Sequence, residues 1–351
     1  MFLIAGFCII VVITVISIVR SKKPLKIILS EAKYELLYNA VGSKAVIQDY
    51  LMKSKNKTDL PLMTGKVAVI TGGNRGIGKE VVKMFLKCDM TILIGCRNIQ
   101  AAKSMIETFR KEGIKTGNAD IYNLDISLIE SIKLFAKEIK SKYYKINYVV
   151  NNAGIMFGPY IETKDGFESQ FSTNYLGHFL LIHLLLPNIK AAGEKNDFSR
   201  IVNVSSCAHH IGDIKFEDIN NRKQYIAGEA YAQSKLAQLL FSNYLNETMK
   251  KEKSFVQSHS VHPGVVNTEL FDGTLLKNKA PWIPNLLFKT PKQGAIPIVY
   301  ACVSKELEGK GGTYIHNCEI FETCQLAKSQ ELQEKLFTFT KDLLNILEFG
   351  N

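Results

Sequence analysis

Short apolar runs alternate with stretches of helical periodicity through most of the chain. The first pair is an apolar run at 66–70, followed by a glycine-rich turn and a helical pattern at 79–87. Further short segments, each expected to form a strand, lie at 90–95, 119–124, 148–150, 200–204, 255–261 and 313–315. Further helical patterns lie at 100–112, 128–140, 165–186, 229–249, 293–305 and 330–347. Repeated strand–helix units predict an α/β fold with a doubly wound parallel sheet, in which a ligand lies beyond the carboxyl ends of the strands.

The N-terminal segment has a different pattern. Residues 2–19 are apolar except for two hydroxyl residues and one glycine, and basic residues follow at 20–23. As a helix this run would span roughly 27 Å, about the thickness of a bilayer core. A cleaved signal peptide is the alternative, but the charged start and the small residues of a cleavage site are missing. We therefore predict a single membrane anchor over 1–23, with the rest of the chain in the cytosol because the basic flank follows the apolar run.

Residues 24–64 are predicted to connect the anchor to the main domain. Pro24 ends the apolar run, and the mixed apolar and polar residues of 25–52 indicate an amphipathic helix. This helix is expected either to lie on the membrane or to pack on the domain. Residues 53–64 are mostly polar, which predicts a linker. Residues 65–351 are then predicted to form one domain.

Composition narrows the class of protein. The 351-residue chain has a formal net charge of +11, with basic stretches at 20–26, 53–57 and 250–253. We interpret these as membrane-surface or solvated charges, and we expect no nucleic-acid partner because no nucleic-acid-binding module is present. The seven cysteines are scattered without a C-x-x-C pair or a zinc-binding spacing. This pattern predicts reduced thiols and no metal site.

The turn after the first strand has the features of a phosphate-binding loop. Glycines at 72, 76 and 78 follow the strand directly and precede a helix. Glycine lets the backbone approach a pyrophosphate closely, and the helix N-terminus favours an anion. The alternative is a glycine-rich turn without a ligand. The cofactor-binding residues predicted in this turn are Gly72, Asn74, Arg75, Gly76, Ile77 and Gly78.

The ends of the next strands suggest which dinucleotide would bind. Arg97 follows the second strand, where an acidic residue would favour NAD(H). Arg97, assisted by Arg75, is placed to pair with a 2′-phosphate, so NADP(H) is favoured and NAD(H) is the alternative. Asp125 ends the third strand and can accept from the adenine amine. After the fourth strand, Asn152, Ala153 and Gly154 allow close approach of the cofactor.

Tyr231 and Lys235 are the candidate acid/base pair. Four positions apart, they share one face of the predicted helix. A nearby ammonium favours the phenolate, so Lys235 is expected to lower the pKa of Tyr231 and make it a usable acid/base. The alternative is that the pair has no catalytic role. In most helices a tyrosine and a lysine at this spacing are simply a partly buried ring and a solvated charge. His178 and His183 are interpreted as packed histidines, since no partner spacing supports a catalytic role.

The combination of motifs resembles the short-chain dehydrogenase/reductase family. The resemblance covers about 65–314 and implies one Rossmann-type domain that holds both cofactor and substrate. Segments 174–181, 200–206 and 231–237 are most similar to its retinol-dehydrogenase-like branch. Within the branch, 263–268, 287–291 and 306–314 are most similar to the polyprenol dehydrogenases of dolichol synthesis. The motifs that carry the family resemblance are Thr71-Gly72-x-x-x-Gly76-x-Gly78, Asn151-Asn152-Ala153-Gly154, Asn174, Ser206, Tyr231-x-x-x-Lys235 and Pro263-Gly264.

The resemblance implies a role for each matching residue. Tyr231 would exchange a proton with the substrate oxygen, and Lys235 would also hold the nicotinamide ribose. Ser206, chosen over Ser205 for its spacing to Tyr231, would bind the substrate oxygen. Asn174 would position a relay water. The segment that would embrace the nicotinamide contributes Pro263, Gly264, Val266 and Thr268.

Residues 270–288 are largely apolar, contain prolines and are expected to be irregular. The segment corresponds to the family's substrate lid, and core packing is an equal alternative. Beside a membrane anchor, it suits a lipid alcohol or aldehyde. The expected substrates are polyprenol and polyprenal or dolichal and dolichol, and retinol and retinal are the alternative. A cofactor-binding scaffold is the non-enzymatic alternative. The endoplasmic reticulum is the expected membrane, with the lipid droplet as an alternative, and the oligomeric state is not assigned.

Overall fold

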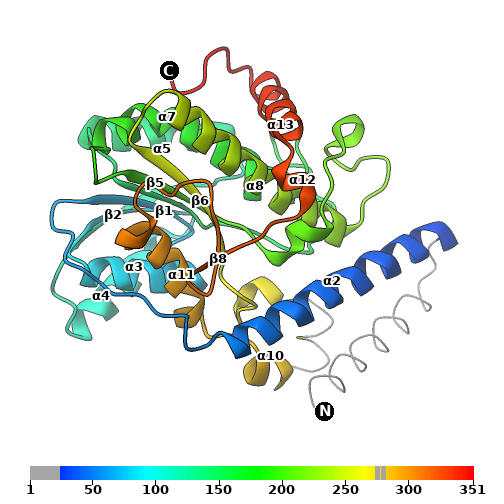
Figure 1. Ribbon diagram of the computed structural model, residues 1–351, viewed down its shortest axis with the longest axis horizontal. Coiled ribbons are helices and arrows are strands. Elements are labelled where there is room, and N and C mark those ends of the chain that lie inside the picture. Colours follow the sequence, from blue (N-terminus) through cyan, green and yellow to red (C-terminus); the bar gives the residue numbers. More distant parts are fainter. Residues whose placement is uncertain (1–23, 273–276, 278–281) are drawn as a thin grey trace.

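The computed structural model describes residues 24–272, 277 and 282–351. Its centre is one eight-stranded sheet with the order β3-β2-β1-β4-β5-β6-β7-β8 (Figure 1). All neighbouring strands are parallel except β8, which runs antiparallel to β7. The predicted parallel α/β sheet is therefore confirmed. The strands are β1 (Val67–Thr71), β2 (Thr91–Cys96), β3 (Asn118–Asn123), β4 (Tyr148–Asn151), β5 (Ser199–Val204), β6 (Val256–His262), β7 (Tyr314–His316) and β8 (Glu319–Phe321).

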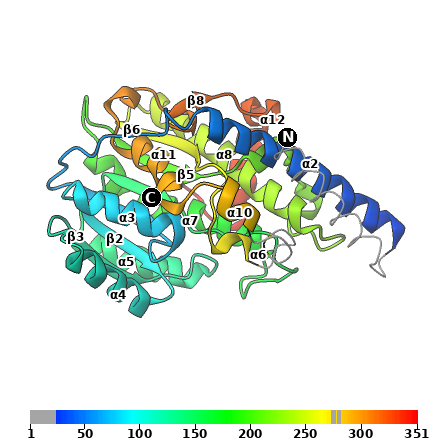
Figure 2. The ribbon, with the colours of Figure 1, turned by 90° about the horizontal axis from the view of Figure 1, so that it is seen from below.

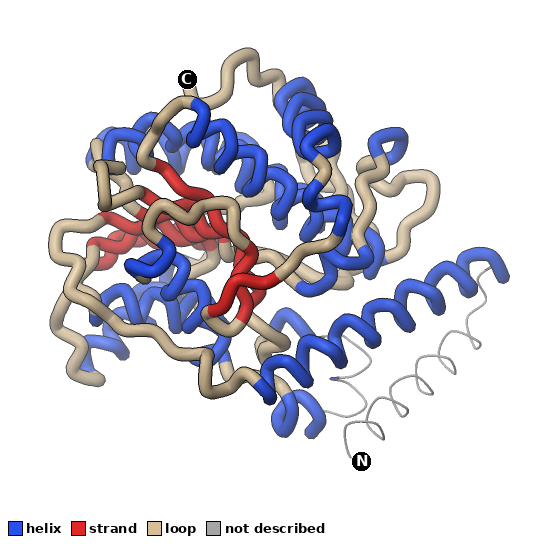
Figure 3. Tube along the Cα trace, in the orientation of Figure 1, coloured by secondary structure: helices blue, strands red, loops and turns tan. Residues whose placement is uncertain are grey.

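Helices cover both faces of the sheet, as Figure 3 shows with the strands in red between two helical layers. One layer contains α3 (Gly76–Lys87), α4 (Ile99–Lys111) and α11 (Pro291–Val303), and the other contains α5 (Ile129–Lys142), α7 (Gly177–Ala192) and α8 (Ala227–Lys251). Successive side chains of a strand alternate between the layers: Val69 joins one apolar cluster, and Ala68 and Ile70 join the other. Because both faces of the sheet are covered, the central strands β1, β2 and β4 are largely apolar, which makes them recognisable in the sequence.

Three elements differ from the prediction. The helix expected at 165–186 begins instead as α6 (Ser169–Phe171) and passes through one π-helical segment, η1 (Ser172–Leu176), before α7. Strand β8 was not predicted, because it is only three residues long and its turn holds Asn317 and Cys318, not glycine, in the left-handed region. The four-residue helix α12 (Gln325–Lys328) was not predicted, whereas α13 (Gln330–Leu343) matches the helix expected at 330–347.

The predicted amphipathic helix is α2 (Leu25–Leu51), and it packs on the domain with one side. The Tyr34 hydroxyl donates to Glu229 of α8 at 2.7 Å. The N-terminal end of α2 extends beyond the body of the domain in both views (Figures 1 and 2). The predicted anchor at 1–23 lies outside the described residues. Over residues 24–272 and 282–351, no helix combines the length and the apolar character needed to cross a bilayer.

Candidate active site

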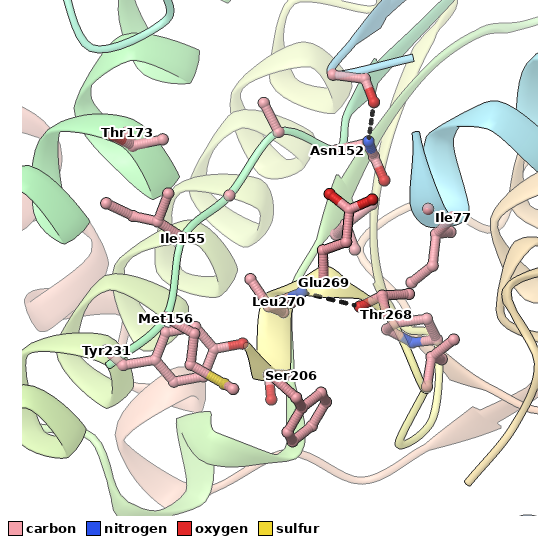
Figure 4. Close-up of a pocket in the computed structure, with 18 of the residues that line it drawn as sticks. Ile77, Asn152, Ile155, Met156, Thr173, Ser206, Tyr231, Thr268, Glu269 and Leu270 are labelled. Atoms are coloured by element: carbon pink, nitrogen blue, oxygen red, sulfur yellow. Dashed lines mark hydrogen bonds between the residues drawn. The ribbon is translucent and has the colours of Figure 1, made fainter. Parts of the chain in front are cut away.

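A cavity of about 1550 Å³ opens at the carboxyl ends of β1, β4, β5 and β6. This volume exceeds the roughly 300–1,000 Å³ of a typical small-molecule pocket and gives room for a dinucleotide and a second apolar molecule. In Figure 4, Tyr231, Met156 and Ser206 lie on one side of the cavity, and Ile77 and Asn152 lie on the other. The cavity lining includes Gly72, Asn74, Arg75, Gly76, Ile77, Gly78, Arg97, Asp125, Asn152, Ala153, Gly154, Ser206, Tyr231, Lys235, Pro263, Gly264, Val266 and Thr268. Every predicted cofactor and catalytic residue except Asn174 is therefore brought to one place.

The glycine-rich turn forms a cradle that only glycine fits. Gly72 and Gly76 have φ angles of +66° and +52°, in the left-handed region. A Cβ at Gly78 would lie 2.3 Å from the Gly72 carbonyl oxygen, so helix α3 can approach the turn only without a side chain there. The first N–H groups of α3 donate no hydrogen bond to the side chain of the N-cap residue, Arg75. These uncapped donors at the cavity, together with the absence of Cβ atoms, fit the pyrophosphate of a dinucleotide.

A buried hydrogen-bond network holds this cradle to β4 and to η1. The Thr71 hydroxyl oxygen accepts from the backbone N–H groups of Asn152 (3.0 Å) and Ala153 (2.9 Å). The hydroxyl in turn lies 2.9 Å from Nε2 of His178, whose Nδ1 donates to the Asn174 carbonyl at 3.1 Å. Burial lowers the pKa of His178 to about 4, so the ring is neutral. His178 thus belongs to the packed interior, as the sequence predicted.

The two arginines predicted near a 2′-phosphate have different surroundings. Arg97 is exposed at the cavity edge, just after β2. Arg75 makes an ion pair with Glu269, at 2.5 Å. The Asp125 carboxylate accepts from the backbone N–H and the hydroxyl of Ser127, at 3.0 and 2.6 Å. Arg97 is consequently the arginine placed to meet an anion in this arrangement.

Tyr231 lies in the first turns of α8 and is almost fully buried. Burial raises the pKa of its phenol, and the hydrogen bond with the Ser206 hydroxyl opposes that rise only in part. Ser205, by contrast, uses its hydroxyl to donate to the backbone carbonyl of Lys235 at 3.1 Å. The geometry therefore pairs Tyr231 with Ser206 and not with Ser205.

Lys235 does not act on Tyr231 as the sequence suggested. Its ammonium donates to the Val204 carbonyl at 2.8 Å and to Oε1 of Gln238 at 3.0 Å. The nitrogen lies 5.7 Å from the centre of the Tyr231 ring. Burial lowers the pKa of Lys235 to about 7, whereas the pKa of Tyr231 is raised. The expected lowering of the Tyr231 pKa is wrong for this arrangement, because desolvation outweighs any attraction between the two groups.

Asn174 lies beside the cavity, in the π-helical segment η1. Its amide nitrogen donates to the Ile155 carbonyl (3.0 Å) and to the Ser234 hydroxyl (2.9 Å), and its amide oxygen accepts from the Ile155 N–H (2.9 Å). A Cβ on Gly154 would lie 3.2 Å from the Asn174 amide oxygen and 3.8 Å from the Lys235 nitrogen. Asn174 thus fixes the strand-end segment next to Lys235, and π-helical turns of this kind often occur at functional sites.

An aromatic wall that the sequence analysis missed faces Tyr231. The ring of Phe157 packs edge-on against Tyr231 at 5.6 Å, and Tyr38 of α2 packs against Phe157 at 4.7 Å. The Tyr38 hydroxyl also donates to the sulfur of Met156 at 3.4 Å. Phe157 has a φ of +58°, which is strained for an aromatic residue. No motif marks Tyr38, because it approaches Tyr231 only through tertiary packing.

The described part of the lid segment is more regular than predicted. Residues 282–287 form the short helix α10 (Trp282–Leu287), whereas an irregular segment was expected. Ile283 is buried, but 58% of Trp282 and 71% of Leu286 are exposed. Ile283, Leu287 and Phe288 line the cavity. The segment therefore combines packing with an apolar cavity wall.

Comparisons with known proteins agree with this geometry. A family model described as short chain dehydrogenase matches residues 66–278. Human polyprenol dehydrogenase is 34% identical over 328 residues, which cover 91% of this chain and 98% of the relative. Polyprenol dehydrogenase of Danio rerio is 37% identical over 84% of this chain and 92% of its own length. Human retinol dehydrogenase 11 is 36% identical over 81% of this chain and 87% of its own length.

Solved structures share the fold. The crystal structure of an uncharacterised protein from Mycobacterium Paratuberculosis superposes with a TM-score of 0.66 at 29% identity, covering 82% of this chain and 96% of that chain. The Pseudomonas aeruginosa RhlG/NADP active-site complex superposes with a TM-score of 0.57 at 22% identity, covering 73% and 95%, and shows likeness of fold alone.

Proposed function

The chain belongs to the short-chain dehydrogenase family, in its retinol-dehydrogenase-like branch, and on this premise we propose that its substrate is a long lipophilic alcohol or aldehyde. Members of the family are oxidoreductases, and the relatives named above act between alcohols and carbonyls. We infer a polyprenol and polyprenal pair, or dolichal and dolichol, for this chain. One observation carries the proposal: Tyr231 lines the same cavity as apolar side chains of α2, of α10 and of the segment after β4.

The proposed chemistry assigns one step to each catalytic side chain. When bound, the nicotinamide cofactor supplies or accepts the hydride. Tyr231 exchanges a proton with the substrate oxygen, which the Ser206 hydroxyl holds by a hydrogen bond. Lys235 holds the cofactor ribose. Asn174 fixes the strand-end segment next to Lys235 and positions a relay water.

The cofactor proposal favours NADP(H). Arg97 lies exposed at the end of β2, where a carboxylate would otherwise bind the ribose hydroxyls. A guanidinium pairs with a phosphate through two parallel hydrogen bonds, which supports a 2′-phosphate at this position. Arg75 can join it only by leaving Glu269, so the main contribution is assigned to Arg97.

A lipid substrate is supported by the apolar part of the cavity. Met156 and Tyr231 form a small apolar cluster, against which Tyr38, Phe157, Leu270 and Phe271 pack. The further apolar lining residues are Val46, Ile47, Ile161, Ile283, Leu287 and Phe288. An apolar wall of this extent matches a hydrocarbon chain better than a small polar carbonyl compound.

Contact with a membrane is supported by the free side of α2. Apolar and basic residues alternate along one exposed stripe of this helix, at the spacing of three and four that places residues on one face. Long lysine side chains reach headgroups while apolar side chains enter the lipid boundary, as in interfacial helices. We propose that this stripe and the anchor at 1–23 place the enzyme on the endoplasmic reticulum or lipid droplet. The stripe consists of Lys26, Leu29, Lys33, Leu36, Leu37 and Leu51.

The decisive experiment compares substrates. The full chain, reconstituted in liposomes, is assayed with polyprenol, dolichal and retinal, each with NADP(H) and with NAD(H). We expect the highest kcat/KM for a polyprenoid substrate with NADP(H). Equal turnover of short soluble carbonyl compounds would contradict the lipid assignment, and higher turnover of retinal would favour the retinoid alternative.

The Tyr231→Phe variant tests the mechanism in the same assay. It keeps the ring and its contact with Phe157 but removes the proton that is transferred. We expect turnover to be abolished while NADPH binding is largely retained. Turnover equal to that of the wild type would reject the assignment of Tyr231.

A further inference from the structure

A buried cluster of charged and polar side chains lies behind the cavity and is used by none of the steps above. Its centre is Asp49, near the end of α2, which is paired with Lys289 at 2.9 Å. Only 6% of the Asp49 side chain and 7% of the Lys289 side chain are exposed. His316 and Asn317, at the turn between β7 and β8, also bond to the Asp49 carboxylate, at 2.8 and 3.1 Å. Four segments far apart in the sequence meet at one carboxylate.

The fourth segment is the one expected to embrace the nicotinamide. The other carboxylate oxygen of Asp49 accepts from the backbone N–H of Val265 at 2.9 Å. Gly264 lies so close that a Cβ there would be 2.6 Å from Asp49 Oδ2, and its φ of +90° also requires glycine. The backbone at 264–265 is therefore in direct contact with the Asp49 carboxylate.

Lys289 holds the same segment from its other side. Its ammonium donates to the Pro263 carbonyl at 3.3 Å, and its backbone N–H donates to the Val265 carbonyl at 2.8 Å. The Asn267 N–H then donates to the Lys289 carbonyl at 2.9 Å. The position of 263–267 is thus set by an ion pair whose acidic member belongs to α2.

The electrostatics agree with an ionised Asp49 carboxylate. Burial would raise the pKa of the Asp49 carboxyl, but the hydrogen bond from His316 and the charge of Lys289 outweigh it and hold the pKa well below its usual value. A buried charge of this kind is costly unless it is fully paired, so removing one member disturbs whatever the pair holds.

We propose that Asp49 is a positioning residue for the cofactor: its carboxylate fixes the segment from Pro263 to Val266, so that helix α2 governs cofactor affinity as well as forming a wall of the substrate side. Helix α2 precedes the residues that the family model matches, which begin at 66. The inference rests on the proposed cofactor site. It makes the orientation of α2, the helix next to the predicted anchor, a determinant of how tightly the cofactor is held.

The test uses Asp49→Ala and a matched control, Tyr34→Phe, in the full chain in detergent micelles. Tyr34→Phe removes the hydrogen bond between α2 and α8, so it loosens the same helix without contacting 263–266. The dissociation constant of NADPH is measured by calorimetry. We expect Asp49→Ala to weaken binding by about tenfold or more, as displaced site residues typically do, and Tyr34→Phe to leave it nearly unchanged. We also expect KM for NADPH to rise more than kcat falls.

A second variant covers the case in which Asp49→Ala does not fold. Asp49→Leu combined with Lys289→Met replaces both charged side chains by apolar ones of similar size and leaves no charge unpaired, so the fold should be retained. We expect this double variant to bind NADPH as weakly as Asp49→Ala. Wild-type affinity in either Asp49 variant, or equal weakening by Tyr34→Phe, would overturn the proposal. A wild-type chain that binds neither NADPH nor NADH would instead reject the proposed function.

Discussion

The ammonium nitrogen of Lys235 lies 5.7 Å from the centre of the Tyr231 ring and donates its hydrogen bonds to other groups. Both side chains are buried, and burial disfavours the charged form of each. The pKa of Tyr231 is therefore raised while that of Lys235 falls to about 7. Tyr231 carries its proton at neutral pH, which suits donation to a carbonyl oxygen.

The low pKa of Lys235 predicts a pH-dependent stability. The unfolded chain keeps the ordinary lysine pKa of about 10.4, so it binds more protons than the folded chain between about pH 7 and 10. The penalty for burying the charge is complete below pH 7 and is relieved as the pH rises. In Lys235→Met this penalty is absent, so its free energy of unfolding relative to the wild type should be highest near pH 7.

Denaturant unfolding of both proteins, without cofactor, at pH 7 and at pH 9.5 measures this difference. The hydrogen bonds to Val204 and Gln238 are lost equally at both pH values, so they cancel in the comparison. A difference between variant and wild type that does not change with pH would show that Lys235 is not a titrating buried base.

Two adjacent serines provide a matched pair for the substrate-oxygen site. Ser206→Ala removes the hydroxyl beside Tyr231 and should lower kcat by about 10²-fold, the usual cost of one oxyanion donor. Ser205→Ala removes a hydrogen bond to the Lys235 carbonyl and should cost about 1 kcal/mol of stability while kcat stays near the wild-type value. Steady-state kinetics with a thermal unfolding scan distinguish the two. A larger loss of kcat in Ser205→Ala would reverse the assignment.

The 2′-phosphate hypothesis predicts a change of cofactor preference. Arg97→Asp replaces the exposed guanidinium by a carboxylate, which repels a phosphate and can accept from ribose hydroxyls. The dissociation constant of NADPH should rise more than that of NADH. Lys251→Asp, an equal change of charge at the exposed C-terminal end of α8, is the control and should leave the preference unaltered. An unchanged preference in Arg97→Asp would remove the argument for NADP(H).

The glycine cradle predicts opposite effects at two glycines that both line the cavity. In Gly78→Ala the added Cβ would lie 2.3 Å from the Gly72 carbonyl oxygen, so the turn must shift. Cofactor binding should be lost and stability should fall by about 1–3 kcal/mol. Gly42 lies within α2 with nothing near the position of a Cβ, so Gly42→Ala should raise stability by about 0.5–1 kcal/mol. Calorimetric binding and urea unfolding check both, and unchanged NADPH binding in Gly78→Ala would contradict the cradle.

The sequence was informative wherever a residue's role depends on its neighbours in the chain. Strands β1, β2 and β4 could be recognised because a parallel strand that is buried on both faces is largely apolar. The glycine turn was visible because its backbone requirement falls on Gly72, Gly76 and Gly78, which lie within one loop. The motif spacings placed these residues, Tyr231 and Lys235 in one family, and the cavity does bring them together.

Tertiary structure alone decided the features that join distant segments. Asp49 and Val265 are 216 positions apart, and Tyr38 and Met156 are 118 apart, so no local pattern marks either pair. The sequence predicted the helix at 25–52 but left open whether it packs on the domain, because its apolar residues suit either surface. The pKa of Tyr231 was expected to fall and is raised, because desolvation depends on how completely the fold encloses a group. The sequence by itself predicted the parallel sheet, the glycine-rich turn and residues that line the cavity. Packing between distant segments decided their burial, their charge states and the position of α2 against the domain.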